Sequence, residues 1–270
     1  MIKLIKLNAR RALNNSWSTA VTQVLILEGV SLLAFLISSL TYGILSFDGL
    51  LRDLRFPPPE AIISSAIILL VFFAFISPFT AGIRAWYYKL SEKGEGAPLS
   101  FCFLPYESFG TILNSVKLSF ILAVKKLFTY ALFTCIPLAI RFYSRGYLMA
   151  AQTPRESFLA SSSLLCGTLL TLLAVVFAYV RCLKYFAVPY FFAESNFTDV
   201  KGAFKASAKA CKEAKGSLLL FNLSLIFYYI LNLCPLTALY SYPYIQSAKS
   251  IYGRFLAERE KRETAGTAQN

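Results

Sequence analysis

The sequence predicts an all-α, polytopic membrane protein with about six transmembrane helices and basic amphipathic helices at the membrane surface. Residues 61–82 contain no charged side chain, and about 20 apolar helical residues cross a hydrocarbon core about 30 Å thick. Hydrophobic residues fill 57% of the 270 positions and charged residues only 15%, a composition more apolar than that of soluble domains. Further uncharged runs cover residues 29–47, 157–180 and 216–248, so several spans are expected.

The N-terminal third predicts a surface helix and two spans. Residues 1–16 carry Lys and Arg but repeat apolar residues at helical spacing, which is typical of a basic amphipathic helix on the membrane surface. A first span over residues 17–47 follows without a small-residue cleavage site, so we expect it to be retained. Three consecutive prolines predict a loop within residues 48–60, and residues 61–83 form the second predicted span.

The third span is predicted over residues 111–140, after a solvated loop over residues 90–110. It contains Lys117, Lys125 and Lys126, and its uncharged part, residues 127–140, is too short to cross a membrane alone. We favour one long, tilted or kinked span that carries lysines. The alternative is an interfacial helix that ends near Lys126, followed by a re-entrant segment.

The C-terminal half predicts three more spans and a second basic helix. Residues 141–156 are expected to form a polar loop, and Asn232–Pro235 a break that divides the last uncharged run. Lys249 is expected to snorkel to the interface. Residues 1–257 then form one membrane domain, and residues 258–270 a disordered cytoplasmic tail. The predicted spans of this half are residues 161–181, 218–233 and 237–255, and the basic helix is residues 198–215.

The distribution of positive charge predicts the orientation of the chain. With six spans, 19 of the 27 Lys and Arg residues fall on the side of the termini and five on the opposite side. Because loops rich in Lys and Arg stay in the cytoplasm, we expect both termini to be cytoplasmic.

Two segments also carry a resemblance to a known family. Residues 181–194 contain Tyr185 and Pro189-Tyr190 before an acidic turn, and the basic helix that follows ends in Lys215-Gly216. This pattern resembles the bacterial multi-span membrane proteins of the domain of unknown function 975 family. The resemblance implies an integral protein of about six helices in a bacterial cytoplasmic membrane, and it supplies no activity to transfer.

The residue types present exclude the commonest catalytic designs. The chain has no histidine, so a Ser-His-Asp triad, a Cys-His dyad and a histidine metal site are all excluded. The six cysteines form no C-x-x-C pair and are interpreted as small apolar core residues. We therefore expect no catalytic residue, no metal and no cofactor, and a protein that is not an enzyme.

Glu28 is the acidic residue inside a predicted span, at a depth comparable to that of Lys125 and Lys126. An ionisable group at the membrane centre costs about 2.5–3.5 kcal/mol, which favours burial against a partner. We predict that Glu28 faces Lys125 or Lys126 in a polar site within the membrane. Such a site either serves proton- or ion-coupled translocation or holds the helices together, and one pair without further carboxylates favours the second interpretation.

The second basic helix is a candidate surface for anionic lipid headgroups. Its apolar residues share one face, and its lysines occupy the other faces. Nucleic acid is not expected, because the chain is tethered to the membrane and has no recognition motif. The candidate lysines are Lys201, Lys205, Lys209, Lys212 and Lys215.

These observations predict an integral membrane protein with a non-enzymatic structural, assembly or envelope-associated role, whose partner is the lipid bilayer. The alternative is a small-molecule, ion or lipid transporter that uses the polar site of Glu28 and the lysines. A membrane-embedded enzyme is the least favoured class.

Overall fold

The computed structural model describes residues 1–50, 59–93, 98–150 and 153–267, and this part of the chain is helical and contains no strand. The all-α prediction is therefore confirmed. The elements are α1 (Ile2–Asn14), α2 (Trp17–Leu50), α3 (Pro59–Lys93), η1 (Leu99–Tyr106), α4 (Phe109–Ala150), α5 (Pro154–Cys182), η2 (Leu183–Tyr185), α6 (Val188–Glu194), α7 (Val200–Glu213), α8 (Lys215–Ser224), α9 (Ile226–Leu231) and α10 (Pro235–Thr267).

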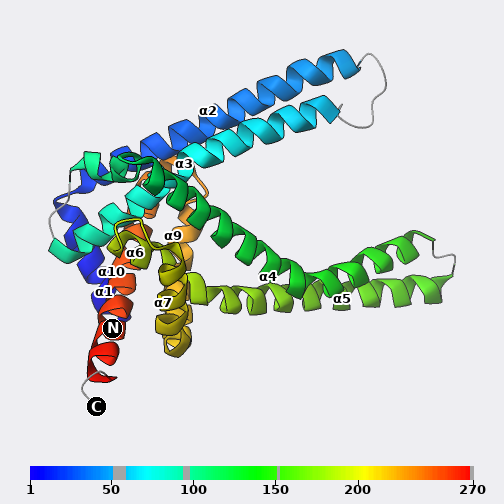
Figure 1. Cartoon of the computed structure of the whole chain (residues 1–270). Helices are drawn as coiled ribbons and strands as arrows, with labels where there is room; N and C mark the ends of the chain where they lie inside the picture. The colour runs from blue at the N-terminus through cyan, green and yellow to red at the C-terminus, as the bar shows by residue number, and fades with distance from the viewer. Residues whose placement is uncertain (51–58, 94–97, 151–152, 268–270) are drawn as a thin grey trace.

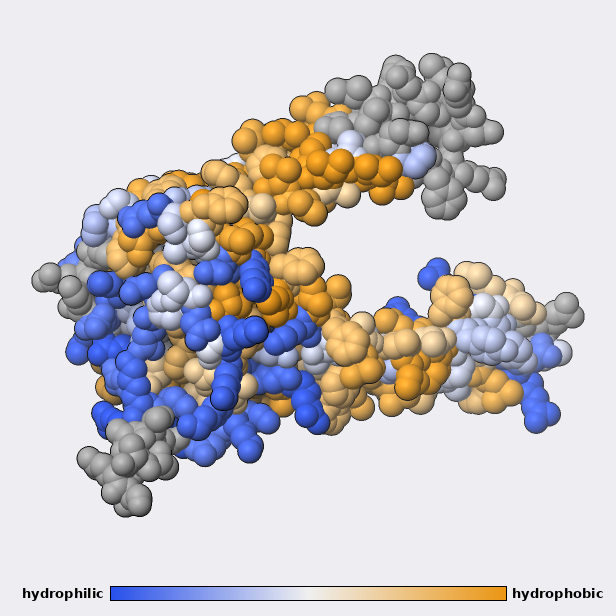
Figure 2. Space-filling view, viewed as in Figure 1, coloured by the Kyte–Doolittle hydropathy of each residue, from blue (hydrophilic) through white to orange (hydrophobic). Residues whose placement is uncertain are grey.

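Two long helical hairpins dominate the molecule. Helices α2 and α3 form one hairpin and α4 and α5 the other, and the two splay apart from a common body (Figure 1). Within the described ranges, four helical segments are long and apolar enough to cross a membrane: Trp17–Leu40, Ile62–Glu92, Phe109–Ala150 and Pro154–Glu194. In α4, no residue of the most apolar window is buried, and the hairpin surfaces are strongly hydrophobic (Figure 2). Hydrocarbon is the solvent that such a surface requires, so these helices belong in a membrane.

Helix α4 is continuous through the whole predicted third span, and the re-entrant alternative is not observed. It changes direction once along its length (Figure 1), and Pro137 in its interior removes a backbone donor. The predicted loop 141–156 is wrong in extent, because α4 continues to Ala150 and α5 begins at Pro154. Arginines on a helix surface do not end a helix. The new helix starts where Thr153 and Glu156 form a capping box and Pro154 occupies the first turn.

The body at the base of the hairpins is polar on its surface (Figure 2) and contains α1, α7 and the C-terminal half of α10. Helix α1 buries Ile5, Ala9 and Leu13 and packs against α10, where the Ser247 hydroxyl donates to the Ala9 carbonyl at 3.3 Å. The predicted helix thus forms, but its apolar face covers protein instead of lipid.

Several of the largest buried side chains lie where α1, α3, α8 and α10 meet. Trp86 and Tyr87 of α3, Phe221 of α8 and Tyr252 of α10 are almost completely buried in one hydrophobic cluster. Gly82 lets α3 approach η1 closely, because a Cβ atom at this position would lie 1.9 Å from the Cys102 carbonyl oxygen. The core therefore sits at the hairpin bases, on the side of the body.

The C-terminal segment forms a third, shorter hairpin. The predicted fifth span, residues 218–233, is divided at Leu225 into α8 and α9, and the predicted sixth, residues 237–255, lies within α10. Neither is among the four helices that meet the length and composition of a span, so the count of six stays a prediction. Three successive hairpins bring the chain ends to the same end of the molecule (Figure 1).

The predicted disordered tail, residues 258–270, is helical over most of its length. Helix α10 continues to Thr267, and residues 268–270 lie outside the described part. Ion pairs hold this extension: Lys209 with Glu260 at 2.7 Å, Arg259 with Glu213, and Lys261 with Glu194. Polar composition alone predicts disorder, but charges with partners on α6 and α7 favour a docked helix.

Candidate functional site

The structure does not bring Glu28 together with either lysine of the predicted polar site. Glu28 is half-buried in α2, and no hydrogen bond or ion pair involves it among the described residues. The Lys125 ammonium lies 4.1 Å from the Phe204 ring centroid of α7. Lys126 turns instead towards a cavity. Because α2 and α4 belong to different hairpins, similar depth along the chain does not make their side chains neighbours.

The five candidate lysines are all exposed, as the amphipathic pattern predicts. Lys201, Lys205, Lys209 and Lys212 lie on α7, and Lys215 begins α8 directly after it; we call these five residues the lysine face of α7. The opposite face of α7 is buried against η2 and α6. There the Ser207 hydroxyl accepts from the Ala187 amide at 3.2 Å and donates to the Lys184 carbonyl at 2.8 Å. Lys209 pairs with Glu260 of α10. Helix α7 is therefore fixed on protein and presents its lysines outwards.

A cavity of about 520 Å³ lies between the base of the α4–α5 hairpin and the third hairpin, and we call it the lysine pocket. Two lysines from different helices reach it, Lys126 of α4 and Lys249 of α10. The Tyr229 hydroxyl donates to the Asn222 amide oxygen at 3.3 Å, and the Lys249 ammonium lies 5.0 Å from the Tyr229 ring centroid. The other lining residues are Tyr130, Tyr179, Cys182, Leu183, Phe186, Leu223 and Ile226.

The charge of the lysine pocket is positive and unbalanced. No carboxylate lines the pocket, and no ion pair involves Lys126 or Lys249 in the part of the chain that the structure describes. Arg84 of α3 lies close enough to repel both lysines electrostatically. Lys249 was expected to snorkel, but it is half-buried and lines this pocket. Two lysines that line one cavity, with no carboxylate among its described walls, make an arrangement suited to an anion.

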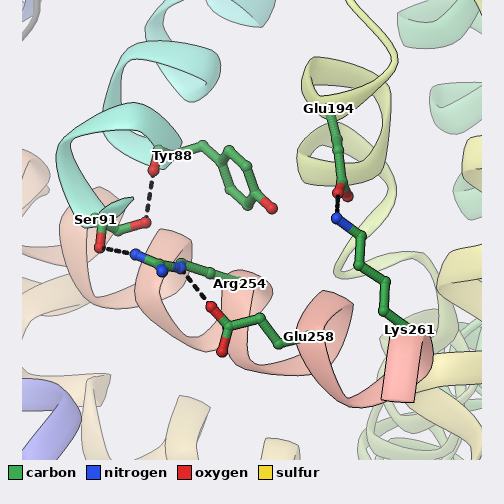
Figure 3. A network of polar contacts seen from close by, with 6 residues as sticks. All are labelled: Tyr88, Ser91, Glu194, Arg254, Glu258 and Lys261. Carbon is green, nitrogen blue, oxygen red and sulfur yellow. Dashed lines mark hydrogen bonds and ion pairs between the residues drawn. The ribbon is translucent and has the colours of Figure 1, made fainter. Parts of the chain in front are cut away.

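A second polar cavity, of about 270 Å³, has a different character, because it is lined by residues of both charges and several of them are paired (Figure 3). Arg254 donates to the Ser91 carbonyl at 2.6 Å and forms an ion pair with Glu258 at 2.7 Å. Lys261 pairs with Glu194 of α6. These contacts join α3, α6 and α10, so this network stabilises the body.

The cavity within the α2–α3 hairpin, about 610 Å³, contains serines such as Ser38 and Ser65 but no charged residue. It offers no feature that would select a charged ligand. The lysine pocket is therefore the better candidate for a functional site.

The cysteines fit the interpretation as core residues only in part. Cys102, Cys182 and Cys211 are buried, whereas Cys135, Cys166 and Cys234 are exposed. Burial raises the pKa of the Cys102 thiol to about 12, and burial also raises the pKa of Cys211. Both thiols stay protonated at neutral pH, which disfavours a role as nucleophile or metal ligand.

Sequence reasoning missed most of the lysine pocket. Lys126 was predicted to lie in a polar site within the membrane and Lys249 to snorkel to the interface, whereas Tyr229 was not a predicted site residue. An available signal was that Lys249 lies within an apolar run beside Tyr-rich segments. Lys126 and Lys249 are about 120 positions apart in the sequence, so only the folded chain shows that they line the same pocket.

Comparison with known proteins identifies the family of the chain. No curated protein and no solved structure matches the chain. The family model described as "Protein of unknown function (DUF975)" matches residues 1–260. Because this match covers nearly the whole chain, the protein belongs to the DUF975 family, as the resemblance in its sequence indicates.

Proposed function

We propose that this protein is a non-catalytic component of the bacterial cytoplasmic membrane with a structural, assembly or envelope-associated role, and that both of its termini are cytoplasmic. The separation of a polar body from apolar hairpins supports a chain that is anchored in the membrane and works at one face of it (Figure 2). The absence of histidine supports a non-enzymatic role.

The observation that carries the proposal is the exposed lysine face of α7, on the body beside the base of the α4–α5 hairpin. Each Lys near an anionic membrane surface contributes about 1 kcal/mol of attraction. Since the apolar face of α7 is already buried in protein, its lysines act on the bilayer through charge. Anionic lipid headgroups are therefore the proposed partner, and nucleic acid is not.

Lipid analysis of the purified protein tests this proposal. The protein is extracted in mild detergent at low and at high salt, and the lipids that remain with it are quantified by mass spectrometry. We expect enrichment of phosphatidylglycerol that falls severalfold at high salt, because salt screens exposed charges. Changing all five lysines to Gln should remove the salt-dependent part, and changing them to Arg should retain it. Equal enrichment in the Gln and Arg variants contradicts the proposal.

A small-molecule, ion or lipid transporter is the second candidate, and the lysine pocket is the observation that favours it. Its charged groups are Lys126 and Lys249, and Glu28 does not line it. Flux of fluorescent phosphatidylglycerol across liposomes distinguishes the two candidates. Flux that the double variant Lys126→Gln/Lys249→Gln abolishes supports transport, and absence of flux supports the non-transporting role.

A further inference from the structure

The lysine pocket contains positive charge that the described protein groups do not neutralise. Lys126 and Lys249 face one cavity, Arg84 adds a third charge nearby, and no carboxylate lines the walls. Each ionisable group placed in a membrane interior is costly and is normally paired. A bound anion would offset this cost, and the conformation with both lysines in the pocket favours such binding.

The hydrogen-bonding groups of the pocket suit an oxyanion. Lysine is a common phosphate ligand, because its ammonium acts as a point charge with several donors. Tyr130 and Tyr179 add hydroxyl groups to the same walls. Asn222 accepts from Tyr229, which fixes the ring against which the Lys249 ammonium lies. These groups come from five helices, α4, α5, α8, α9 and α10, so their convergence is a property of the fold and not of one basic stretch.

The remaining walls of the pocket include apolar residues that are exposed on the outside of the molecule. Leu223 and Ile226 line the pocket, yet 51% and 55% of their surfaces are exposed. The neighbouring Phe227 is also exposed and apolar. These exposed apolar side chains would not stabilise a bound water-soluble anion. An acyl chain would be stabilised, because apolar surface is removed from water where the chain contacts them. The pocket thus combines a cationic end with a hydrocarbon exit.

We propose that the lysine pocket binds the phosphate group of an anionic phospholipid, whose acyl chains leave the pocket over Leu223 and Ile226. A cavity of about 520 Å³ lies within the usual range for small-ligand sites and suits a phosphate with its glycerol. Phospholipids with a quaternary ammonium group are disfavoured, because the two lysines repel that group. The residues that carry this proposal line the pocket and do not belong to the lysine face of α7, which carries the proposed function.

Lipid binding to the purified full-length protein tests the assignment. The protein in detergent micelles is titrated with phosphatidylglycerol, phosphatidylcholine and glycerol 3-phosphate, and binding is followed by native mass spectrometry. We expect phosphatidylglycerol to bind at least tenfold more tightly than the other two. Equal affinity for phosphatidylglycerol and phosphatidylcholine overturns the proposal. If glycerol 3-phosphate binds as tightly as the lipid, the occupant is a water-soluble phosphate and the lipid assignment is wrong.

Variants locate the binding in the pocket. Lys126→Gln/Lys249→Gln should weaken phosphatidylglycerol binding at least tenfold, while Lys125→Gln, the same change at the preceding residue of α4, should leave it unchanged. Leu223→Trp narrows the mouth without changing charge, and we expect a similar loss. Its control is Leu220→Trp, at an exposed position of α8 that does not line the pocket. Wild-type affinity in a folded Leu223→Trp protein overturns the proposal even if the double lysine variant fails to fold.

These experiments distinguish the proposal for the lysine pocket from the proposal for the lysine face of α7, because each has its own contradicting result. The variant with Gln at all five positions of the lysine face should retain tight, salt-resistant binding of phosphatidylglycerol, because the pocket is intact. Loss of that tight binding in the α7 variant would assign it to the lysine face and overturn the pocket proposal.

Discussion

Lys125 and Lys126 are adjacent in sequence but have different surroundings in the fold. Successive residues of an α-helix are rotated by about 100°, so two neighbouring lysines leave the helix in different directions. Lys125 lies over the Phe204 ring, and Lys126 lines the lysine pocket. The prediction that either would face Glu28 depended on depth alone. Depth does not specify the direction of a side chain around its helix.

Gly82 allows the closest backbone approach in the core, and Gly82→Ala should therefore destabilise the protein. The added Cβ would lie 1.9 Å from the carbonyl oxygen of Cys102, which is backbone and cannot rotate away. Overpacking of this kind costs about 1–3 kcal/mol. Thermal unfolding in detergent, followed by circular dichroism, should show a lower midpoint. Gly29→Ala is the matched control, since nothing lies within 4 Å of its Cβ position. A midpoint equal to that of the control would show that η1 does not pack on α3.

Among the helices, α1 and α7 show what local sequence can and cannot predict. Both form where the amphipathic pattern places them, because the spacing of apolar residues is a local property. The surface that each covers is not local. Ile5 and Ala9 of α1 pack in the core beside α10, and Ser207 of α7 bridges two backbone groups near η2.

Ser207→Ala should destabilise the docking of α7. The Ala187 amide and the Lys184 carbonyl would both lose a hydrogen-bond partner at a buried position, which costs about 1–3 kcal/mol. Hydrogen exchange measured by mass spectrometry should then show faster exchange over residues 184–214. Ser162→Ala, at an exposed position of α5, makes the same chemical change and should leave exchange unaltered. Unaltered exchange in Ser207→Ala as well would mean that α7 is held by its apolar face alone.

The ends of elements were predicted less well than their existence. Arg141 and Arg145 indicated a loop, yet they lie within α4, because charged residues are compatible with a helix wherever their side chains reach water or headgroups. The residues that begin α5, Thr153 and Glu156, carry a capping signal that could have located the turn. The helical extension of α10 was not predictable in this way, since its ion-pair partners lie on α6 and α7.

The whole molecule is best described as three hairpins that meet at one polar body. Composition and uncharged runs were sufficient to predict a helical membrane protein, because the hydrocarbon core imposes length and apolarity on every span. They could not predict the lysine pocket, whose walls come from the second and third hairpins. A site between hairpins depends on how helices are rotated and paired, and neither property is encoded in hydropathy.

The proposed topology places the tip of the second hairpin and the body on opposite sides of one membrane. Single cysteines at Arg145 near the tip of the second hairpin and at Lys205 on α7, each in a chain without its native cysteines, test it most directly. Intact spheroplasts are treated with a membrane-impermeant maleimide, before and after permeabilisation. We expect Arg145→Cys to be labelled in intact spheroplasts and Lys205→Cys only after permeabilisation. Labelling of both from the outside, or of neither until permeabilisation, would contradict it.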